Sequence, residues 1–203
     1  ENLMKKIYLS TGNKGKVSEI KEILSDLNYD VYSKSELGIN EDAVEDAETL
    51  EGNSLIKAKF LKKYTDDIVM SDDTGLFVNS LGGRPGVYSA RFAGDECDDT
   101  KNRQKLLSEL KDKEDRSAYF ETVITIIDSN NEIHQAKGRV DGKILLEECG
   151  EHGFGYDSIF MPDGYDKSFA QMEDCEKNKI SHRKRALENA KIILKGLNES
   201  SNN

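Results

Sequence analysis

Two adjacent aspartates, Asp72 and Asp73, stand between an apolar run and a Thr-Gly pair in the stretch MSDDTGLFVN. Carboxylates at the end of a buried strand can share the work of hydrolysis, because one can ligate Mg²⁺ while the other activates a water molecule. Neighbouring side chains on a strand point to opposite faces, so this interpretation requires the strand to end at the pair. An Asx turn that merely stops the strand explains the same residues, and the pair alone favours the turn.

The stretch STGNKGKVSEI, residues 10–20, offers a second kind of chemistry. A strand that turns through Gly12 and Gly15 into a helix presents free backbone N–H groups and the positive end of a helix dipole to an anion. It is not a P-loop, because two residues separate the glycines and Val17, not a hydroxyl residue, follows Lys16. Both a phosphate site and an ordinary capped helix with solvated lysines fit this stretch.

The acidic run EDAVEDAETLE, residues 41–51, could supply a further ligand for a hard metal ion, although most such runs are solvated surface. In GFGYDSIF, residues 153–160, glycines flank Phe154, so its ring could leave the loop and stack on a planar ligand. A core aromatic is the alternative. EKNKISHRKRAL, residues 176–187, is the most basic patch and provides either cationic donors for a ligand or a solvated helix face.

Together these stretches supply phosphate donors, a hard metal site, a stacking ring and cationic donors. Those are the parts of a nucleoside phosphate site in which a metal assists attack by water. No nucleophilic Cys or Ser with a suitably placed His stands out, so covalent catalysis is the less attractive interpretation.

Composition narrows the class of protein. The chain has 203 residues and a formal net charge of −10, which argues against non-specific binding to nucleic acid. It shows neither an apolar run near about 18 residues nor a signal-peptide pattern, so we expect no membrane association. Three cysteines without a C-x-x-C pair predict a reduced, cytoplasmic protein, and three scattered histidines give no zinc spacing.

The elements that must position these residues alternate between helix and strand in the first part of the chain. Strands are predicted at 5–10, 67–70, 118–128 and about 133–140, and a short one within 153–166. Helices are predicted at about 16–27, 53–64, 98–110 and 181–197, and the Gly- and Pro-rich stretch 81–86 is predicted to be a loop. The early alternation with a later hairpin predicts an α/β fold with a mixed sheet.

The sequence resembles the inosine triphosphate pyrophosphatase family, the non-standard purine nucleoside triphosphate (dITP/XTP) diphosphatases. The resemblance runs from Met4 to about Leu197. It rests on motifs in a fixed order: TGNKGK, TLEGNSLIKA, SDDTGLFVNSLGGRPGVYSARFAG, GFGYDSIFMPDGYDKSFAQM and KNKISHRKRAL.

The resemblance implies an elongated, two-lobed α/β fold around a long curved mixed sheet with flanking helices. Substrate would lie in the cleft between the lobes, and the protein would be a homodimer. Residues 4–197 would form one two-lobed domain, followed by a polar tail at 198–203. Residues 1–3 precede Met4 and are expected to be a remnant added to the native sequence.

The implied activity is Mg²⁺-dependent hydrolysis of ITP, dITP or XTP to the nucleoside monophosphate and pyrophosphate, which removes deaminated purines from the cytoplasmic nucleotide pool. A nucleotide sensor that has lost catalysis is one alternative. A diphosphatase for modified pyrimidine triphosphates is another.

Matching positions imply a role for each site residue. Asp73 would be the general base, and Glu45 and Asp72 would bind the metal, although Glu48 and Glu51 remain candidates. The triphosphate would contact Thr11, Gly12, Asn13, Lys16 and Lys57, and the base and sugar would contact Phe154, Gly155, Tyr156, Asp157, Lys177, His182 and Arg183. Ser158 stands where the family usually has proline, which is expected to loosen that loop, and Lys184 stands where many bacterial members have glycine.

Overall fold

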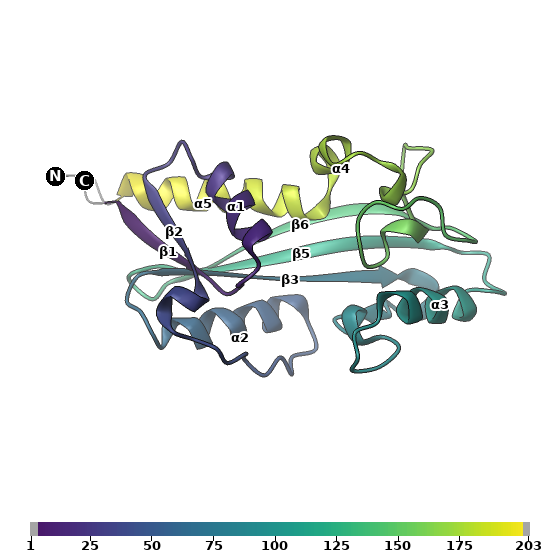
Figure 1. Ribbon diagram of the computed structural model, residues 1–203, viewed down its shortest axis with the longest axis horizontal. Coiled ribbons are helices and arrows are strands. Elements are labelled where there is room, and N and C mark those ends of the chain that lie inside the picture. The colour runs from purple at the N-terminus through teal and green to yellow at the C-terminus, as the bar shows by residue number, and fades with distance from the viewer. Residues whose placement is uncertain (1–3, 201–203) are drawn as a thin grey trace. The chain divides into compact units, whose positions relative to one another are not determined.

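The computed structural model describes residues 4–200. Its strands are β1 (Lys5–Leu9), β2 (Tyr29–Ser33), β3 (Ile68–Val78), β4 (Pro85–Gly86), β5 (Ser117–Ile127), β6 (Ile133–Ile144) and β7 (Phe160–Pro162). Its α-helices are α1 (Lys14–Ile23), α2 (Leu50–Lys62), α3 (Asp99–Glu109), α4 (Asp174–Ile180) and α5 (His182–Ser200) (Figure 1). No helix in this part of the chain is long and apolar enough to cross a membrane.

The strands form a seven-stranded mixed sheet in the order β2-β1-β3-β5-β6-β7, with β4 paired to β3. Strand β1 pairs in parallel with both β2 and β3, whereas the pairs β3–β4 and β6–β7 are antiparallel. The predicted α/β fold with a mixed sheet is confirmed.

The chain divides into two compact units. The first comprises residues up to 73 together with 122–138 and the chain from 185 onward, and the second comprises 74–121 and 139–184. Strand β3 leaves the first unit immediately after Asp73, and β5 and β6 also contribute to both units. The resemblance implies that residues 4–197 form one two-lobed domain, and this stays a prediction.

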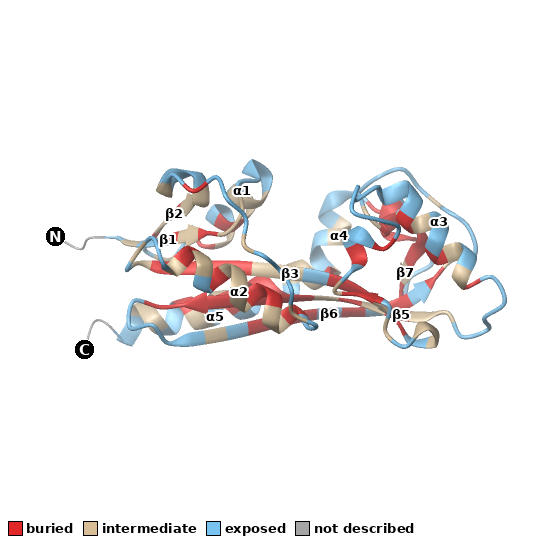
Figure 2. Ribbon diagram, turned by 90° about the horizontal axis from the view of Figure 1, so that it is seen from below, coloured by how far each residue is buried: buried red, intermediate tan, exposed pale blue. Residues whose placement is uncertain are grey.

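In the first unit, alternation along the strands sends apolar side chains to both faces of the sheet. Ile68 and Met70 of β3 belong to one core cluster, which includes residues of α1 and α5. Val69, between them, belongs to another cluster with Ala58 and Leu61 of α2. Helix α2 therefore covers the opposite face from α1 and α5, and Figure 2 shows the buried residues along the strands and the helix faces that meet them.

The second unit has its own core, built largely from aromatic rings. The ring centroids of Phe120 and Phe160 lie 4.6 Å apart in an edge-on arrangement, and those of Phe160 and Phe169 lie 5.3 Å apart. Leu106, from α3, is buried in the same cluster. This core supports the loop that carries Phe154.

Several predicted boundaries were wrong. Strand β3 does not end at Met70 but continues to Val78, since it is hydrogen-bonded to β5 in the sheet and also pairs with β4 at Leu76 and Phe77. Helix α2 begins at Leu50, since the Thr49 hydroxyl accepts a hydrogen bond from the Gly52 N–H and caps it. The short helix α4 was not predicted. Helix α5 extends to Ser200, so it includes part of the predicted polar tail, whereas residues 1–3 and 201–203 lie outside the described residues.

Candidate active site

The two aspartates lie within a continuous strand, so the predicted turn at this pair is wrong. Alternation persists through β3, and each aspartate faces a different helix. An oxygen of Asp72 lies 3.8 Å from the ammonium nitrogen of Lys16 in α1. On the other face, Oδ1 of Asp73 lies 3.6 Å from the ammonium nitrogen of Lys57 in α2.

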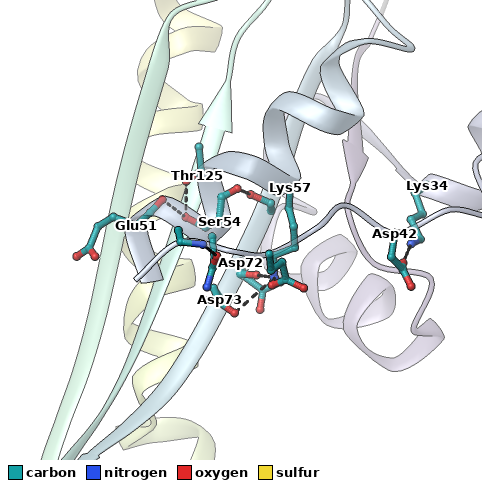
Figure 3. Close-up of polar contacts among 12 residues, drawn as sticks. Lys34, Asp42, Glu51, Ser54, Lys57, Asp72, Asp73 and Thr125 are labelled. Carbon is teal, nitrogen blue, oxygen red and sulfur yellow. Dashed lines mark hydrogen bonds and ion pairs between the residues drawn. The ribbon is translucent and has the colours of Figure 1, made fainter. Parts of the chain in front are cut away.

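The end of β1 leaves the edge of β3 open beside both aspartates. The β1–β3 ladder stops where Leu9 pairs with Met70, and the N–H of Ser10 donates a 3.0 Å hydrogen bond to the Met70 carbonyl. Beyond this point β1 no longer covers the edge of β3. The ammonium group of Lys57 reaches that edge and donates to the Asp72 backbone carbonyl while it pairs with Asp73 (Figure 3). Lys57 thus contacts both aspartates.

The acidic loop contributes Glu45 to this group. An oxygen of Glu45 lies 3.3 Å from the Lys57 ammonium nitrogen. Glu51 instead pairs with Lys137 at 2.6 Å, and that hydrogen bond lowers the pKa of Glu51 despite partial burial. Of the three candidate acids, Glu45 is therefore the one that shares a partner with the aspartates.

Burial gives Asp73 unusual acid–base properties. Desolvation, reinforced by the charges of Glu45 and Asp72 and opposed by Lys57, raises the pKa of Asp73 to about 6. Its Oδ2 atom is buried and has no hydrogen-bond partner among the described residues. Burial alone would lower the pKa of Lys57, but attraction to Asp73, Asp72 and Glu45 outweighs it, so that pKa is raised. Lys57 remains a cation, and Asp73 can exchange a proton near neutral pH.

A buried hydrogen-bond chain fixes α2 against the sheet. The Ser71 hydroxyl donates to the backbone carbonyl of Ser54, and the Ser54 hydroxyl lies 2.6 Å from that of Thr125 on β5 (Figure 3). Because Lys57 lies three residues after Ser54 in the same helix, this chain sets where its ammonium group reaches β3. We did not predict these residues, although hydroxyl groups at buried positions of an apolar segment were the available signal.

The turn that contains Gly12 and Gly15 leads into helix α1, and the Asn13 side chain caps the N-terminus of that helix. The side-chain oxygen of Asn13 accepts hydrogen bonds from the N–H groups of Gly15 and Lys16 at 2.9 and 3.1 Å, and Thr11 Oγ1 accepts from the Asn13 N–H. Two backbone groups that were expected to be free are therefore satisfied by a side chain. The turn still brings Lys16 to Asp72. Among residues 4–200 no comparable contact is seen for Gly12, whose missing Cβ would meet nothing within 4 Å.

A pocket of ≈ 230 Å³ adjoins the acidic group within the first unit. Glu45 and Lys57 line it together with Ser10, Lys34 and Phe60, among others. Lys34 pairs with Asp42 of the acidic loop, and Asn53 accepts a 2.9 Å hydrogen bond from the Ala47 N–H. The loop that bears Glu45 is thus tied to its surroundings on both sides of that residue.

The second unit holds the aromatic candidate. The side chain of Phe154 is 75% exposed, so Phe154 is not a core residue. Its N–H donates a 3.1 Å hydrogen bond to the buried carboxylate of Asp157, which also pairs with Lys177 at 2.7 Å. The Lys177 ammonium lies 5.2 Å from the centroid of the Phe154 ring. The structure therefore brings Phe154, Asp157 and Lys177 together.

The remaining residues predicted to bind the base, Tyr156, His182 and Arg183, make other contacts. Tyr156 is buried, its hydroxyl donates a 2.6 Å hydrogen bond to the Ser89 carbonyl, and desolvation raises its pKa. These contacts hold the Tyr156 side chain in place inside the second unit. The ring of His182 stacks on Phe120 with centroids 4.7 Å apart, which orients the imidazole at the start of α5, and Arg183 follows half-buried.

A further set of ligand-type atoms lies at the turn between β5 and β6, where atoms of Asp128, Glu132 and His134 are within 4.8 Å of one another. The Asp128 carboxylate accepts hydrogen bonds from the N–H groups of Asn130 and Glu132 and pairs with His134 at 2.9 Å. These contacts close the turn, and we interpret the set as a structural one.

The sequence is similar to those of known proteins over nearly its whole length. The model of the Ham1 family matches residues 7–192. A curated protein of Clostridium perfringens named dITP/XTP pyrophosphatase is 48% identical over 202 residues, covering 96% of this chain and 99% of that protein. One of the same name from Bacillus subtilis is 45% identical over 194 residues, covering 95% and 98%.

Two solved structures of Ham1 proteins are similar to this one over nearly the whole chain. The Ham1 protein of Staphylococcus aureus superposes with a TM-score of 0.90 at 39% identity, covering 95% of this chain and 99% of that one. A HAM1 protein from Coxiella burnetii gives 0.91 at 36% identity, covering 95% and 100%.

Proposed function

The chain belongs to the Ham1 family, and from this premise we propose that it hydrolyses ITP, dITP and XTP to nucleoside monophosphate and pyrophosphate. Curated relatives at 45–48% identity carry the name dITP/XTP pyrophosphatase. The observation on which the proposal chiefly rests is Asp73, a buried carboxylate whose pKa is raised to about 6 and whose Oδ2 lacks a hydrogen-bond partner among the described residues.

The residues around Asp73 fit a magnesium ion. Glu45, Asp72 and Asp73 supply carboxylate oxygens, the hard donors that Mg²⁺ prefers. The carboxylates of Glu45 and Asp73 already pair with one cation, Lys57, which also binds the backbone carbonyl of Asp72. We propose that Glu45 and Asp72 hold the ion. When bound, Mg²⁺ would neutralise phosphate charge and polarise the linkage between the α and β phosphates.

The protein's own groups divide the remaining work. Asp73 would accept a proton from the water that attacks the α-phosphorus, since its raised pKa makes it a better base than an ordinary aspartate. Lys57 and Lys16, which pair with acids in this structure, would turn to the phosphates of a bound triphosphate. The hydroxyl of Thr11 and the side-chain amide of Asn13 would add donors at the start of α1.

The second unit would bind the base and sugar. Phe154 offers an exposed ring for stacking, and Lys177 lies beside it. Donors from Lys177, His182 and Arg183 suit the 6-oxo oxygen of hypoxanthine or xanthine, whereas the 6-amino group of adenine would leave such donors unpaired. Gly155, Tyr156 and Asp157 would shape the same site.

We further propose a cytoplasmic homodimer that acts on free nucleotides and binds neither nucleic acid nor membranes. The net charge of −10 supports the part concerning nucleic acid, because a polyanion is repelled unless local cations or a metal compensate.

A substrate panel tests the proposal. The protein is incubated with ITP, XTP, GTP, ATP and dUTP, with and without Mg²⁺, and nucleoside monophosphate, pyrophosphate and orthophosphate are quantified. We expect monophosphate and pyrophosphate from ITP and XTP, with at least about tenfold lower kcat/KM for ATP, whose 6-amino group leaves the donors unpaired, and for dUTP, which is not a purine. GTP, whose base also carries a 6-oxo oxygen, measures how far recognition extends beyond that oxygen. Inactivity on every substrate, or orthophosphate as the first product, would refute the proposed reaction. A preference for dUTP would refute the purine assignment.

A further inference from the structure

Both backbone polar groups of Gly155, its N–H and its carbonyl, are hydrogen-bonded to side chains of helix α3. The Gly155 N–H donates a 3.0 Å hydrogen bond to the carboxylate of Asp99, and the Arg103 guanidinium donates a 2.7 Å hydrogen bond to the Gly155 carbonyl. Asp99 and Arg103 are four residues apart, so they lie on one face of the helix. Both polar groups of the residue that follows Phe154 are therefore bound by a single rigid element.

The Arg103 guanidinium is itself fixed. Besides the Gly155 carbonyl, it donates to the carboxylate of Glu148 and, at 3.3 Å, to the hydroxyl of Thr100. Its side chain is only 17% exposed. A planar guanidinium with three different acceptors loses most of its freedom, which suits it to holding a loop in place.

Ser158 joins the same network. Its hydroxyl donates a 3.0 Å hydrogen bond to the Glu148 carboxylate that binds Arg103. A serine at this position, where proline is usual in the family, was expected to loosen the loop. In the structure this serine adds a hydrogen bond that connects the loop, through Glu148, to Arg103 of α3.

The remaining anchors lie on the other side of Phe154. The Asp157 carboxylate accepts from the Phe154 N–H, and a Cβ at Gly153 would lie 2.2 Å from that carboxylate. Gly155 has φ of +59°, in the left-handed region that glycine adopts readily, although a Cβ there would meet nothing within 4 Å. Backbone conformation, and not space, is therefore what favours glycine between the two contacts with α3.

The result is a large apolar ring, 75% exposed, on a backbone that is held on both sides. Ordering a mobile side chain or loop on binding typically costs about 0.5–1.5 kcal/mol per side chain, which corresponds to about two- to twelvefold in affinity. A loop that is fixed in advance avoids this cost.

We propose that Asp99 and Arg103 are positioning residues that clamp the Gly155 peptide and thereby hold Phe154 ready to stack on the purine base. This inference rests on the proposed function for its ligand, but the clamp itself is a property of this unit alone. The clamp acts on binding of the base and leaves the reacting phosphates untouched.

The first test uses Arg103→Met, which keeps side-chain length and helix propensity but removes the guanidinium. We expect KM for ITP to rise about three- to tenfold, with kcat within about twofold, and binding of inosine monophosphate, measured by calorimetry, to weaken by the same factor. Arg103→Lys, which keeps a donor within reach of the carbonyl, should recover part of the loss. Lys101→Met removes one positive charge from the same helix at an exposed position and should match wild type.

The second test compares Asp99→Asn with Asp99→Ala. Both remove the charge that favours the first turn of α3, so both lose the same interaction with the helix dipole. Only asparagine keeps an oxygen that can accept from the Gly155 N–H. KM should therefore rise more for Asp99→Ala than for Asp99→Asn, and equal values would overturn the role of this hydrogen bond.

Amide hydrogen exchange of Gly155, followed by NMR without nucleotide, separates this inference from the proposed function. Exchange should be faster in Arg103→Met and Asp99→Ala than in wild type and Lys101→Met. Unchanged exchange would overturn the clamp whatever the substrate. An inactive wild type with a protected Gly155 amide would refute only the proposed function. Faster exchange with unchanged binding of inosine monophosphate by an active enzyme would refute the link to the base.

Discussion

The ammonium nitrogen of Lys57 lies 3.6 Å from an oxygen of Asp73 and also binds the carbonyl of Asp72 and the carboxylate of Glu45. One lysine thus holds the acidic group together. Without it, three carboxylates would repel one another in a partly buried place, where charges are weakly screened. Because these residues make different contacts, the role of each can be tested by its own substitution.

Asp73→Asn should abolish catalysis while leaving the shape of the site intact. Asparagine cannot accept the proton of the attacking water, so kcat for ITP should fall by about 10²–10⁴. Binding of inosine monophosphate, measured by calorimetry, should stay within about twofold of wild type. Turnover that survives the substitution would show that another group is the base.

The same variant should be more stable than wild type at neutral pH. The pKa of Asp73 is raised from 3.8 to about 6 in the folded state, so protonation favours folding, and this contribution is complete below pH about 4 and lost as the pH rises through about 6. Asparagine removes the cost of a buried charge, and we expect a gain of up to about 3 kcal/mol at pH 7.5. Urea unfolding in EDTA from pH 4 to 8 measures it, and a gain that does not grow with pH would contradict the assigned cause.

Lys57→Met should impair both substrate binding and the acidic group. The variant loses a phosphate partner and leaves Asp73 beside Glu45 without the cation that lowers its pKa, so KM for ITP should rise at least about tenfold. Lys59→Met, at an exposed position of the same helix, controls for the loss of one charge. Equal KM values for the two variants would argue against a role for Lys57 in binding phosphate.

The choice among the acids of the loop can be decided by metal binding. Glu45→Gln should raise the Mg²⁺ concentration needed for half-maximal activity by about tenfold and weaken Mg²⁺ binding measured by calorimetry without nucleotide. Glu48→Gln, an exposed residue of the same loop, should behave like wild type. The reverse pattern would move the metal site to Glu48.

Phe154→Ala should weaken base binding without destabilising the fold. Stacking of a base on an aromatic ring is worth about 1–3 kcal/mol, so KM for ITP should rise about five- to 150-fold, with a smaller effect on kcat. The ring is 75% exposed, and the melting temperature should stay within about 2 °C of wild type. Leu146→Ala, at a side chain 80% exposed, is the matched control for loss of surface apolar area.

Local patterns were sufficient for much of the fold. Apolar periodicity predicted β1, α1, α3, β5 and α5 near their observed positions, because each of these segments carries its own pattern of buried residues. The ordered motifs also identified the family, which the comparisons confirmed.

The sequence by itself determined which residues carry charge, rings and hydroxyl groups, and in what order along the chain. Tertiary structure decided the conformation of Asp72 and Asp73, since the extension of β3 depends on its neighbours β5 and β4, and the open edge beside the two aspartates depends on where β1 stops. It also decided that Lys57 reaches Glu45, and that Asp99 and Arg103 grip a glycine more than fifty residues away. Contacts between distant segments depend on packing and desolvation, which no local pattern of residues contains.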